Sequence, residues 1–136
     1  MTTPRVQTVT CHHCGRTLHA QDWRYQRHST TAKSPHPCPV SYQRVPRGGE
    51  SDADWRHRAR IVADLAWQMR DCDPMLVRAY LDGLLRSQPE ELLRLFLVAL
   101  TGVRVDPDAS VDANLDQAFG WVAGLPGASS GVGVPA

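Results

Sequence analysis

Apolar side chains recur at steps of three and four residues after residue 50, which is the spacing of one helix face. The stripe over residues 55–70 predicts a first helix with a core-facing side. Ser51 followed three residues later by Asp54 forms a capping-box pattern and marks where this helix starts. The positions of the stripe are Trp55, Ala59, Val62, Leu65, Ala66 and Met69.

Two more helices follow after short start signals. Asp73 before Pro74 is a cap followed by a residue suited to a first helical turn, so we expect a helix over 74–86. A third helix starts near Pro89 and is apolar on nearly every side except at Arg94. We therefore expect it at the centre of a helical bundle.

A fourth helix is predicted over 111–122 after the loop that begins at Gly102. Leu115, Phe119 and Val122 would dock it onto the others. The small residues after Gly124 favour a disordered tail.

Residues before the helices follow a different pattern. Two short alternating segments, about 16–19 and 23–28, predict a β-hairpin, and prolines and glycines over 39–54 indicate a linker. The fold class is therefore mainly α, with a small β-hairpin zinc-finger module followed by a three- to four-helix bundle. The predicted segments are a module over 1–46, a linker over 47–54, a helical bundle over 55–123 and a disordered tail over 124–136.

The chemistry of the first segment centres on its cysteines. Cys11 and Cys14 are separated by two residues, so one tight turn can direct both sulfurs to the same ion, and Gly15 supplies the conformational freedom that such a turn needs. Cys38 adds a third thiolate. Together with one histidine they would complete the tetrahedral ligand set of a structural Zn²⁺ site.

Several histidines compete for the fourth position. We expect His12 and His13 to face solvent, because turning them to the ion between two ligand cysteines would strain the turn. His19 follows Cys14 too closely and points away. His28 returns at the end of the predicted hairpin and is favoured, while His36, two residues before Cys38, stays an alternative.

The segments CHHCGR, YQRHS and CPVSYQRVP, over about residues 10–46, resemble short zinc-finger modules of small actinobacterial and phage proteins. In those modules CxxCG is followed by an RH pair and a Cys-Pro-x-Ser closure. The resemblance implies His28 as the fourth ligand. A leucine-rich acidic bundle after the module is also similar to those proteins, whose activity is largely unassigned.

The net charge of +1 is unevenly distributed. Residues 1–48 carry +6 and residues 49–136 carry −5, so the module is basic and suits an anionic partner. Cations interleaved with aromatic rings are typical of nucleic-acid contact. The candidate nucleic-acid-binding residues are Arg24, Tyr25, Arg27, Lys33, Arg44 and Arg47.

Other classes have little support in the sequence. No HExxH, GxSxG, GxGxxG or P-loop pattern occurs, and a Cys3His shell leaves zinc no open position, so we expect no enzyme. There is no apolar run of membrane-spanning length and no signal-peptide pattern, which favours the cytoplasm. Cys72, between two aspartates, is interpreted as a half-buried structural cysteine; an iron–sulfur cluster would require it as a fourth cysteine ligand.

The sequence thus predicts a zinc-binding protein whose basic module binds nucleic acid. The alternative is a protein-interaction adaptor, with a protein partner or a homo-oligomer formed through the helical part, in which zinc is structural only.

Overall fold

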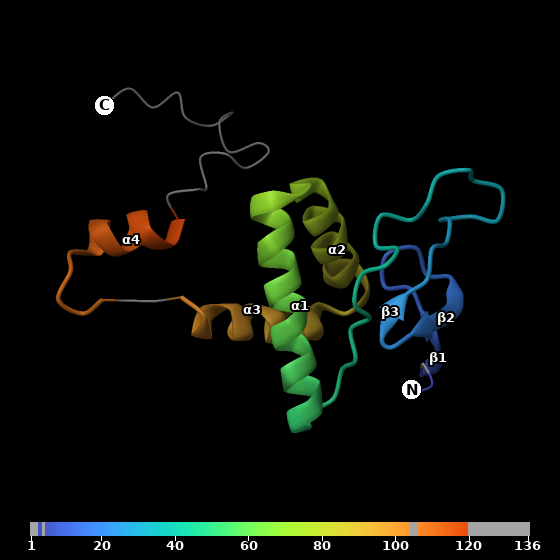
Figure 1. The fold of residues 1–136 in the computed structure, drawn as a ribbon, viewed down its shortest axis with the longest axis horizontal. Coiled ribbons are helices and arrows are strands. Elements are labelled where there is room, and N and C mark those ends of the chain that lie inside the picture. Colours follow the sequence, from blue (N-terminus) through green and yellow to red (C-terminus); the bar gives the residue numbers. More distant parts are fainter. Residues whose placement is uncertain (1–2, 4, 104–105, 120–136) are drawn as a thin grey trace.

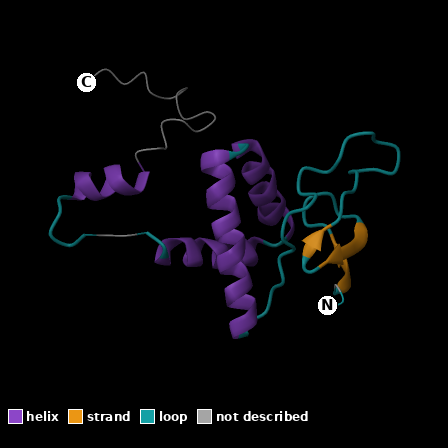
Figure 2. Ribbon diagram, viewed as in Figure 1, coloured by secondary structure: helices purple, strands orange, loops and turns teal. Residues whose placement is uncertain are grey.

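The computed structural model describes residues 3, 5–103 and 106–119. Three strands lie at one end of the molecule and helices occupy the rest (Figures 1 and 2). The fold is therefore mixed α and β rather than mainly α, although the order of a small β module followed by helices is as predicted. The predicted tail and the end of the predicted fourth helix, including Val122, lie outside the described residues, as do the side chains of Leu115 and Phe119.

The sheet has three antiparallel strands in the order β1-β2-β3. β1 (Val6–Thr10) pairs with β2 (Thr17–Gln21), which pairs with the two-residue β3 (Arg24–Tyr25). The predicted two-stranded hairpin did not include β1. This strand alternates between exposed and half-buried positions and packs Val9 against the core. On its other side β3 hydrogen-bonds to a later loop, with Tyr25 N donating to Gln43 O over 2.9 Å.

The turn between β2 and β3 is held by contacts outside the sheet. Asp22 and Trp23 both have positive φ, 51° and 59°, as a two-residue type I′ hairpin requires, and neither is glycine. The guanidinium of Arg47 lies 4.6 Å from the Trp23 ring centroid, and the ring packs edge-on against His57. Arg47, which precedes the first helix, and His57, which lies in it, thus hold an otherwise costly turn in place.

The first two helices start where the capping signals predict. α1 (Asp52–Asp71) is capped by Ser51, whose hydroxyl accepts from Asp54 N while the Asp54 carboxylate accepts from Ser51 N. α2 (Pro74–Ser87) is capped by Asp73, which accepts from Met75 N over 2.9 Å. No described helix is long and apolar enough to cross a membrane.

The third helix lies at the surface, so the prediction that it is central was wrong. α3 (Pro89–Thr101) crosses α1 and buries Glu91 and Leu95 on one side only (Figure 1). α4 (Val111–Phe119) makes no contact with another element among the described residues, and Figure 1 shows it standing apart. In the part of the chain that the structure describes, three helices pack together and no element covers the outer side of α3.

The buried side of α1 includes two polar residues that the apolar stripe did not predict. His57 and Arg58 are buried beside Ile61 and Leu65. Arg58 is accommodated because its Nε donates to Glu91 Oε1 over 2.6 Å and its Nη2 to Oε2 over 3.1 Å. This ion pair joins α1 to α3, and of the predicted stripe only Leu65 is buried.

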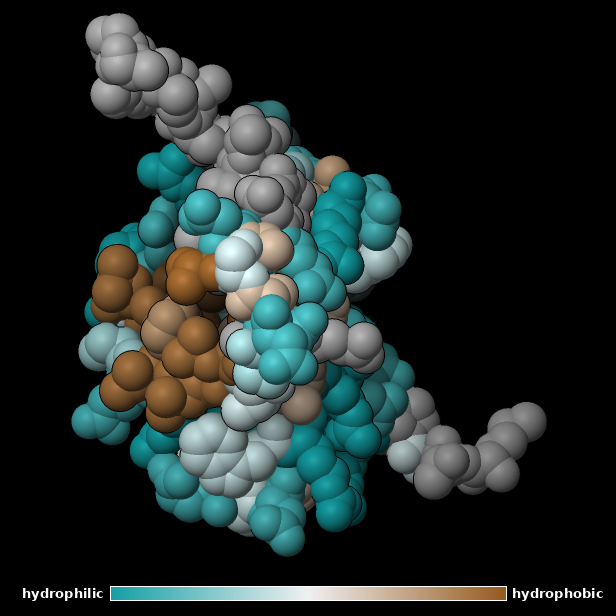
Figure 3. All heavy atoms as spheres, turned by 90° about the vertical axis from the view of Figure 1, so that its left-hand side faces the viewer, coloured by the Kyte–Doolittle hydropathy of each residue, from teal (hydrophilic) through white to brown (hydrophobic). Residues whose placement is uncertain are grey.

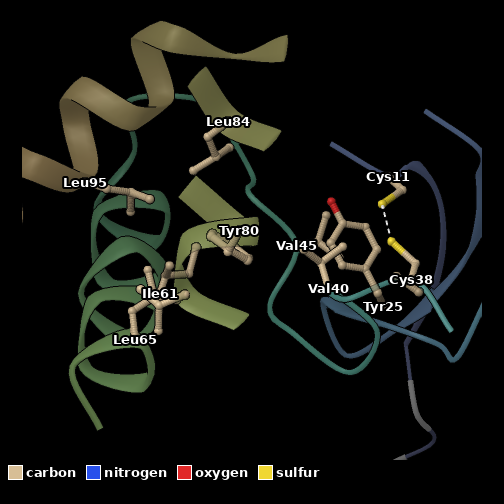
Figure 4. Packing of buried hydrophobic residues seen from close by; sticks show 12 residues of the cluster. Cys11, Tyr25, Cys38, Val40, Val45, Ile61, Leu65, Tyr80, Leu84 and Leu95 are labelled. Carbon is tan, nitrogen blue, oxygen red and sulfur yellow. Dashed lines mark hydrogen bonds between the residues drawn. The ribbon is translucent and has the colours of Figure 1, made fainter. Parts of the chain in front are cut away.

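The buried apolar residues extend from the module into the helices (Figure 4). Tyr80 of α2 donates its hydroxyl proton to the carbonyl of Arg44 over 2.6 Å and so joins the two parts. The loop through Val45 lies between Tyr80 and Tyr25 in the same view. The module is thereby packed onto α1 and α2.

Candidate metal centre

The first half of the site is a turn at Cys11 and Cys14, just after β1. Gly15 has φ 78° and donates its N–H to Cys11 O over 2.9 Å, while Cys11 N donates to Arg16 O over 2.8 Å. Gly15 thus takes the left-handed conformation expected of it.

The second half comes from His28 and Cys38, which a single backbone hydrogen bond brings together. Cys38 N donates to His28 O over 2.6 Å, and a bridge between Ser29 and Pro37 closes the intervening loop at its base. The hydroxyl of Ser41 lies 3.3 Å from both His28 N and His28 O. His28 and Cys38, which are ten residues apart in the sequence, therefore lie side by side.

The four predicted ligands form one cluster. Every pair among the ligand atoms of Cys11, Cys14, His28 and Cys38 lies within 4.8 Å. The sulfurs of Cys11 and Cys38 are 3.9 Å apart (Figure 4), close to the separation of about 3.8 Å expected of two sulfurs bound tetrahedrally to one zinc at about 2.3 Å. The cysteines are free thiols, and this sulfur separation is far beyond a disulfide bond.

The tautomer of His28 suits a metal ligand. Its Nδ1 lies 2.8 Å from the carbonyl oxygen of Gln26, which can only accept, so Nδ1 carries the proton. Its Nε2 is buried and has no hydrogen-bond partner. A metal-binding histidine typically donates from one ring nitrogen to a carbonyl and coordinates with the other. The bare lone pair of Nε2 therefore fits a metal ion.

Burial keeps Cys11 and Cys38 of the cluster as neutral thiols in the absence of an ion. Burial raises the pKa of Cys11, although the N–H groups of Cys14 and His13 offset part of this. Burial also raises the pKa of Cys38 to about 12, against the opposing effect of the Val40 N–H. A bound divalent ion stabilises the charged thiolates directly and so lowers the pKa values that burial raises. The cluster can thus hold a metal such as zinc.

The other histidines lie outside the cluster. His36, the alternative ligand, and His19 are both exposed and take no part in it. His13 is half-buried, with its Nδ1 3.8 Å from the Cys38 sulfur. It lies beside the ligands without belonging to the four-residue set, a position that sequence spacing could not indicate.

His12 contradicts the expectation that it faces solvent. It is 4 % exposed, with Nε2 donating to the Tyr80 carbonyl over 3.1 Å and Nδ1 accepting from the Tyr25 hydroxyl over 2.8 Å. Burial lowers its pKa to about 4, which keeps the ring neutral. His12 therefore links the metal-binding turn to α2, a role that sequence reasoning missed.

The predicted nucleic-acid-binding residues are mostly engaged elsewhere. Tyr25 is buried, so it offers no ring to a base, and this expectation was wrong. Arg24 and Arg44 both reach Asp64 of α1, at 3.5 and 2.6 Å. Arg47 pairs with Asp54 at 3.2 Å.

Arg27 and Lys33 are the two predicted basic residues that stay exposed, and neither has an ion-pair partner among the described residues. Cys72 is exposed just after α1, so it is not a half-buried structural residue. It also lies outside the four-residue cluster, which removes the fourth cysteine that an iron–sulfur cluster would require.

The chain matches no protein-family model, no curated protein and no solved structure. The resemblance to small actinobacterial and phage zinc-finger proteins therefore stays a prediction, and the metal site is supported by its geometry.

Proposed function

We propose that this chain is a non-catalytic interaction protein whose N-terminal module is held together by structural zinc. The observation that carries the proposal is the buried Cys3His cluster, with His28 Nε2 unpartnered beside three thiols. Four protein ligands complete the tetrahedron of zinc and leave no position for an activated water. The metal then acts as scaffolding for the surfaces around it.

Metal analysis tests the structural role. Protein purified with zinc should contain one zinc per chain, and His28→Ala should weaken binding of Zn²⁺ and of the spectroscopic probe Co²⁺. His36→Ala is the matched control, because His36 is an exposed histidine on the same loop. Protein that takes up neither ion would refute the proposal.

The ion pairs of the module favour a protein partner over nucleic acid. Asp64 and Asp54 of α1 neutralise three of the five basic side chains that would contact phosphate. The helices meanwhile expose large apolar side chains, including Phe96 and Leu97, that suit protein contact. The adaptor hypothesis is therefore the better supported.

Nucleic acid is kept as the second candidate because of Arg27 and Lys33, which are exposed on the loop around His28. Binding to labelled duplex and single-stranded DNA and RNA across a salt series separates the two hypotheses. The adaptor hypothesis expects weak binding at low salt. Binding that falls with a slope near −0.9 per duplex phosphate contact would favour nucleic acid instead.

If such binding appears, the Arg27→Ala/Lys33→Ala double variant should abolish it. Arg56→Ala/Arg60→Ala, at two exposed arginines of α1, removes the same charge elsewhere. Equal losses in both double variants would point to net charge rather than to a site on the module.

A further inference from the structure

The outer side of α3 is a ridge of four apolar side chains. They follow the spacing i, i+3, i+4, i+7, which places them on one face of the helix, and each is about half exposed. No charged side chain lies among them. We call this the α3 ridge; its residues are Leu93 (58 % exposed), Phe96 (58 %), Leu97 (48 %) and Leu100 (49 %).

An apolar groove lies beside the ridge. It is open, has a volume of about 270 Å³, and is formed where α1, α2 and α3 meet. Phe96 belongs to both the ridge and the groove, so the two are continuous, and Figure 3 shows hydrophobic side chains gathered on one face of the molecule. Other residues that line this helical groove include Val62, Met69, Leu81, Leu92 and Ala99, together with the charged Arg70.

The helices of the same chain do not cover this surface. α1 and α2 pack against the side of α3 opposite the ridge, where Glu91 is buried, and Leu95 lines the groove at the edge of this contact. α4 makes no contact with α3 among the described residues. Within residues 5–103 and 106–119, the ridge and the groove are therefore both open to a second molecule.

We propose that the occupant is a second copy of this chain, with the two α3 helices antiparallel about a two-fold axis. The spacing of the ridge is three, one and three residues, so it reads the same in both directions. An antiparallel pair then sets Leu93 opposite the second copy's Leu100 and Phe96 opposite its Leu97. Such a self-matching patch is what an isologous interface requires.

The exposed area shows how much of this surface a dimer must use. At about 200 Å² for a large side chain, the exposed parts of the ridge amount to roughly 400 Å² per copy. A stable interface buries about 800 Å² per partner, so the ridge alone is too small. The antiparallel arrangement brings each ridge alongside the adjoining groove of the other copy, and the groove contributes further apolar area. This inference rests on the proposed interaction role and names the partner.

Sedimentation of the zinc-loaded full chain over a concentration series tests the dimer. The wild type should dimerise, and Leu93→Glu should raise the dissociation constant at least about 100-fold, because the substitution buries a carboxylate at both ends of the interface. Leu85→Glu is the matched control, a leucine of α2 that is 59 % exposed and outside the ridge and groove. It should change the constant less than about threefold.

A charge-pair design tests the antiparallel register. Leu93→Lys and Leu100→Glu should each weaken the dimer, while the double variant should recover at least about tenfold in affinity, because each lysine then faces a glutamate. A parallel pair would place like charges together and would not recover. Helical circular dichroism confirms that each variant is folded.

A monomeric wild type at all concentrations overturns the dimer, as does equal dissociation by Leu93→Glu and Leu85→Glu. A double variant no tighter than its parents overturns the register. Zinc content is measured on the same samples, so a monomer that holds one zinc per chain refutes this inference and leaves the zinc site intact.

Discussion

The N-terminal module and the three packed helices bury similar numbers of apolar residues but do so by different means. In the module two of the six are candidate metal ligands. The buried set of the module is Cys11, Ala20, Tyr25, Cys38, Val40 and Val45, and that of the helices is Ile61, Leu65, Val77, Tyr80, Leu84 and Leu95. The module is thus expected to depend on an ion for folding, whereas the helices depend on side-chain packing.

Beside the apolar core that they share, the two regions are joined by polar contacts. Ser87 donates to the carbonyl of His12 over 2.9 Å, and Gln43 and Gln68 exchange two hydrogen bonds of 3.1 and 2.8 Å. Each contact joins a loop of the module to a helix. Loss of the module's fold should therefore weaken the helices without abolishing them.

The largest expected effect is loss of the metal. Apparent zinc binding of roughly 10–16 kcal/mol would supply the folding free energy of the module. Cys38→Ser or chelation should therefore abolish the amide chemical-shift dispersion of β1, β2 and β3 and retain most helical circular dichroism. Cys72→Ser, at the exposed cysteine, is the control and should bind zinc as the wild type does. A sheet that stays folded without metal would contradict the expectation that the module depends on an ion for folding.

The next effect lies within the helices. Arg58 and Glu91 are 1 % and 2 % exposed and paired at 2.6 Å, so Glu91→Gln leaves a buried guanidinium without its counter-charge. We expect the free energy of unfolding, measured in urea, to fall by about 3–5 kcal/mol.

The double variant Arg58→Met/Glu91→Leu is the control for this ion pair. It removes both charges and should be near wild type or more stable, because an apolar pair of similar volume carries no desolvation penalty. A double variant that is less stable than Glu91→Gln would show that the ion pair itself stabilises the helices.

A smaller effect is expected at the junction between the regions. A Cβ added at Gly83 of α2 would lie 2.9 Å from His12 Cδ2, 3.0 Å from His13 Cα and 3.1 Å from His12 O. Two of these are backbone atoms that cannot move without displacing the metal-binding turn. We expect Gly83→Ala to cost about 1–3 kcal/mol in chemical denaturation, against the usual stabilisation of a helix by alanine.

Gly102→Ala is the control for the junction. Its added Cβ would approach only one backbone oxygen, at 3.4 Å, and no residue of the module. If Gly83→Ala were as stable as this control, the module would not be packed tightly on α2.

Sequence reasoning succeeded where the signal is local. The helix starts at Ser51 and Asp73 follow from capping patterns that act within three residues. The four residues of the candidate metal site were favoured from the Cys-x-x-Cys turn, the later Cys38 and the hairpin that leads to His28, although His36 stayed an alternative.

The errors concern contacts between distant segments. The burial of His12 depends on Tyr80, 68 residues away, and the engagement of Arg24 depends on Asp64, 40 residues away. The position of α3 was predicted wrongly because an apolar helix indicates burial but does not indicate what buries it. Its apolar face can pack against another helix of the same chain or against a second copy. Only the packing of the whole chain decides these points.

The smallest expected effect is the pH response of His57, which lies where α1 meets the module. Its Nε2 donates to Val45 O over 2.7 Å, and burial lowers its pKa below the ordinary 6.5. The unfolded chain then binds a proton more readily than the folded one. The stabilisation is fully present above about pH 6.5 and is lost as the pH falls towards the lowered value.

Unfolding measured between pH 7.5 and 5 should therefore show a smaller loss of stability in His57→Gln, whose amide can still donate to Val45, than in the wild type. The comparison cancels any loss of bound metal in acid, because both proteins keep the same four candidate ligands. His36→Gln removes an exposed histidine instead and should follow the wild-type curve. If His57→Gln also followed it, His57 would not be the group that makes the junction between module and helices sensitive to acid.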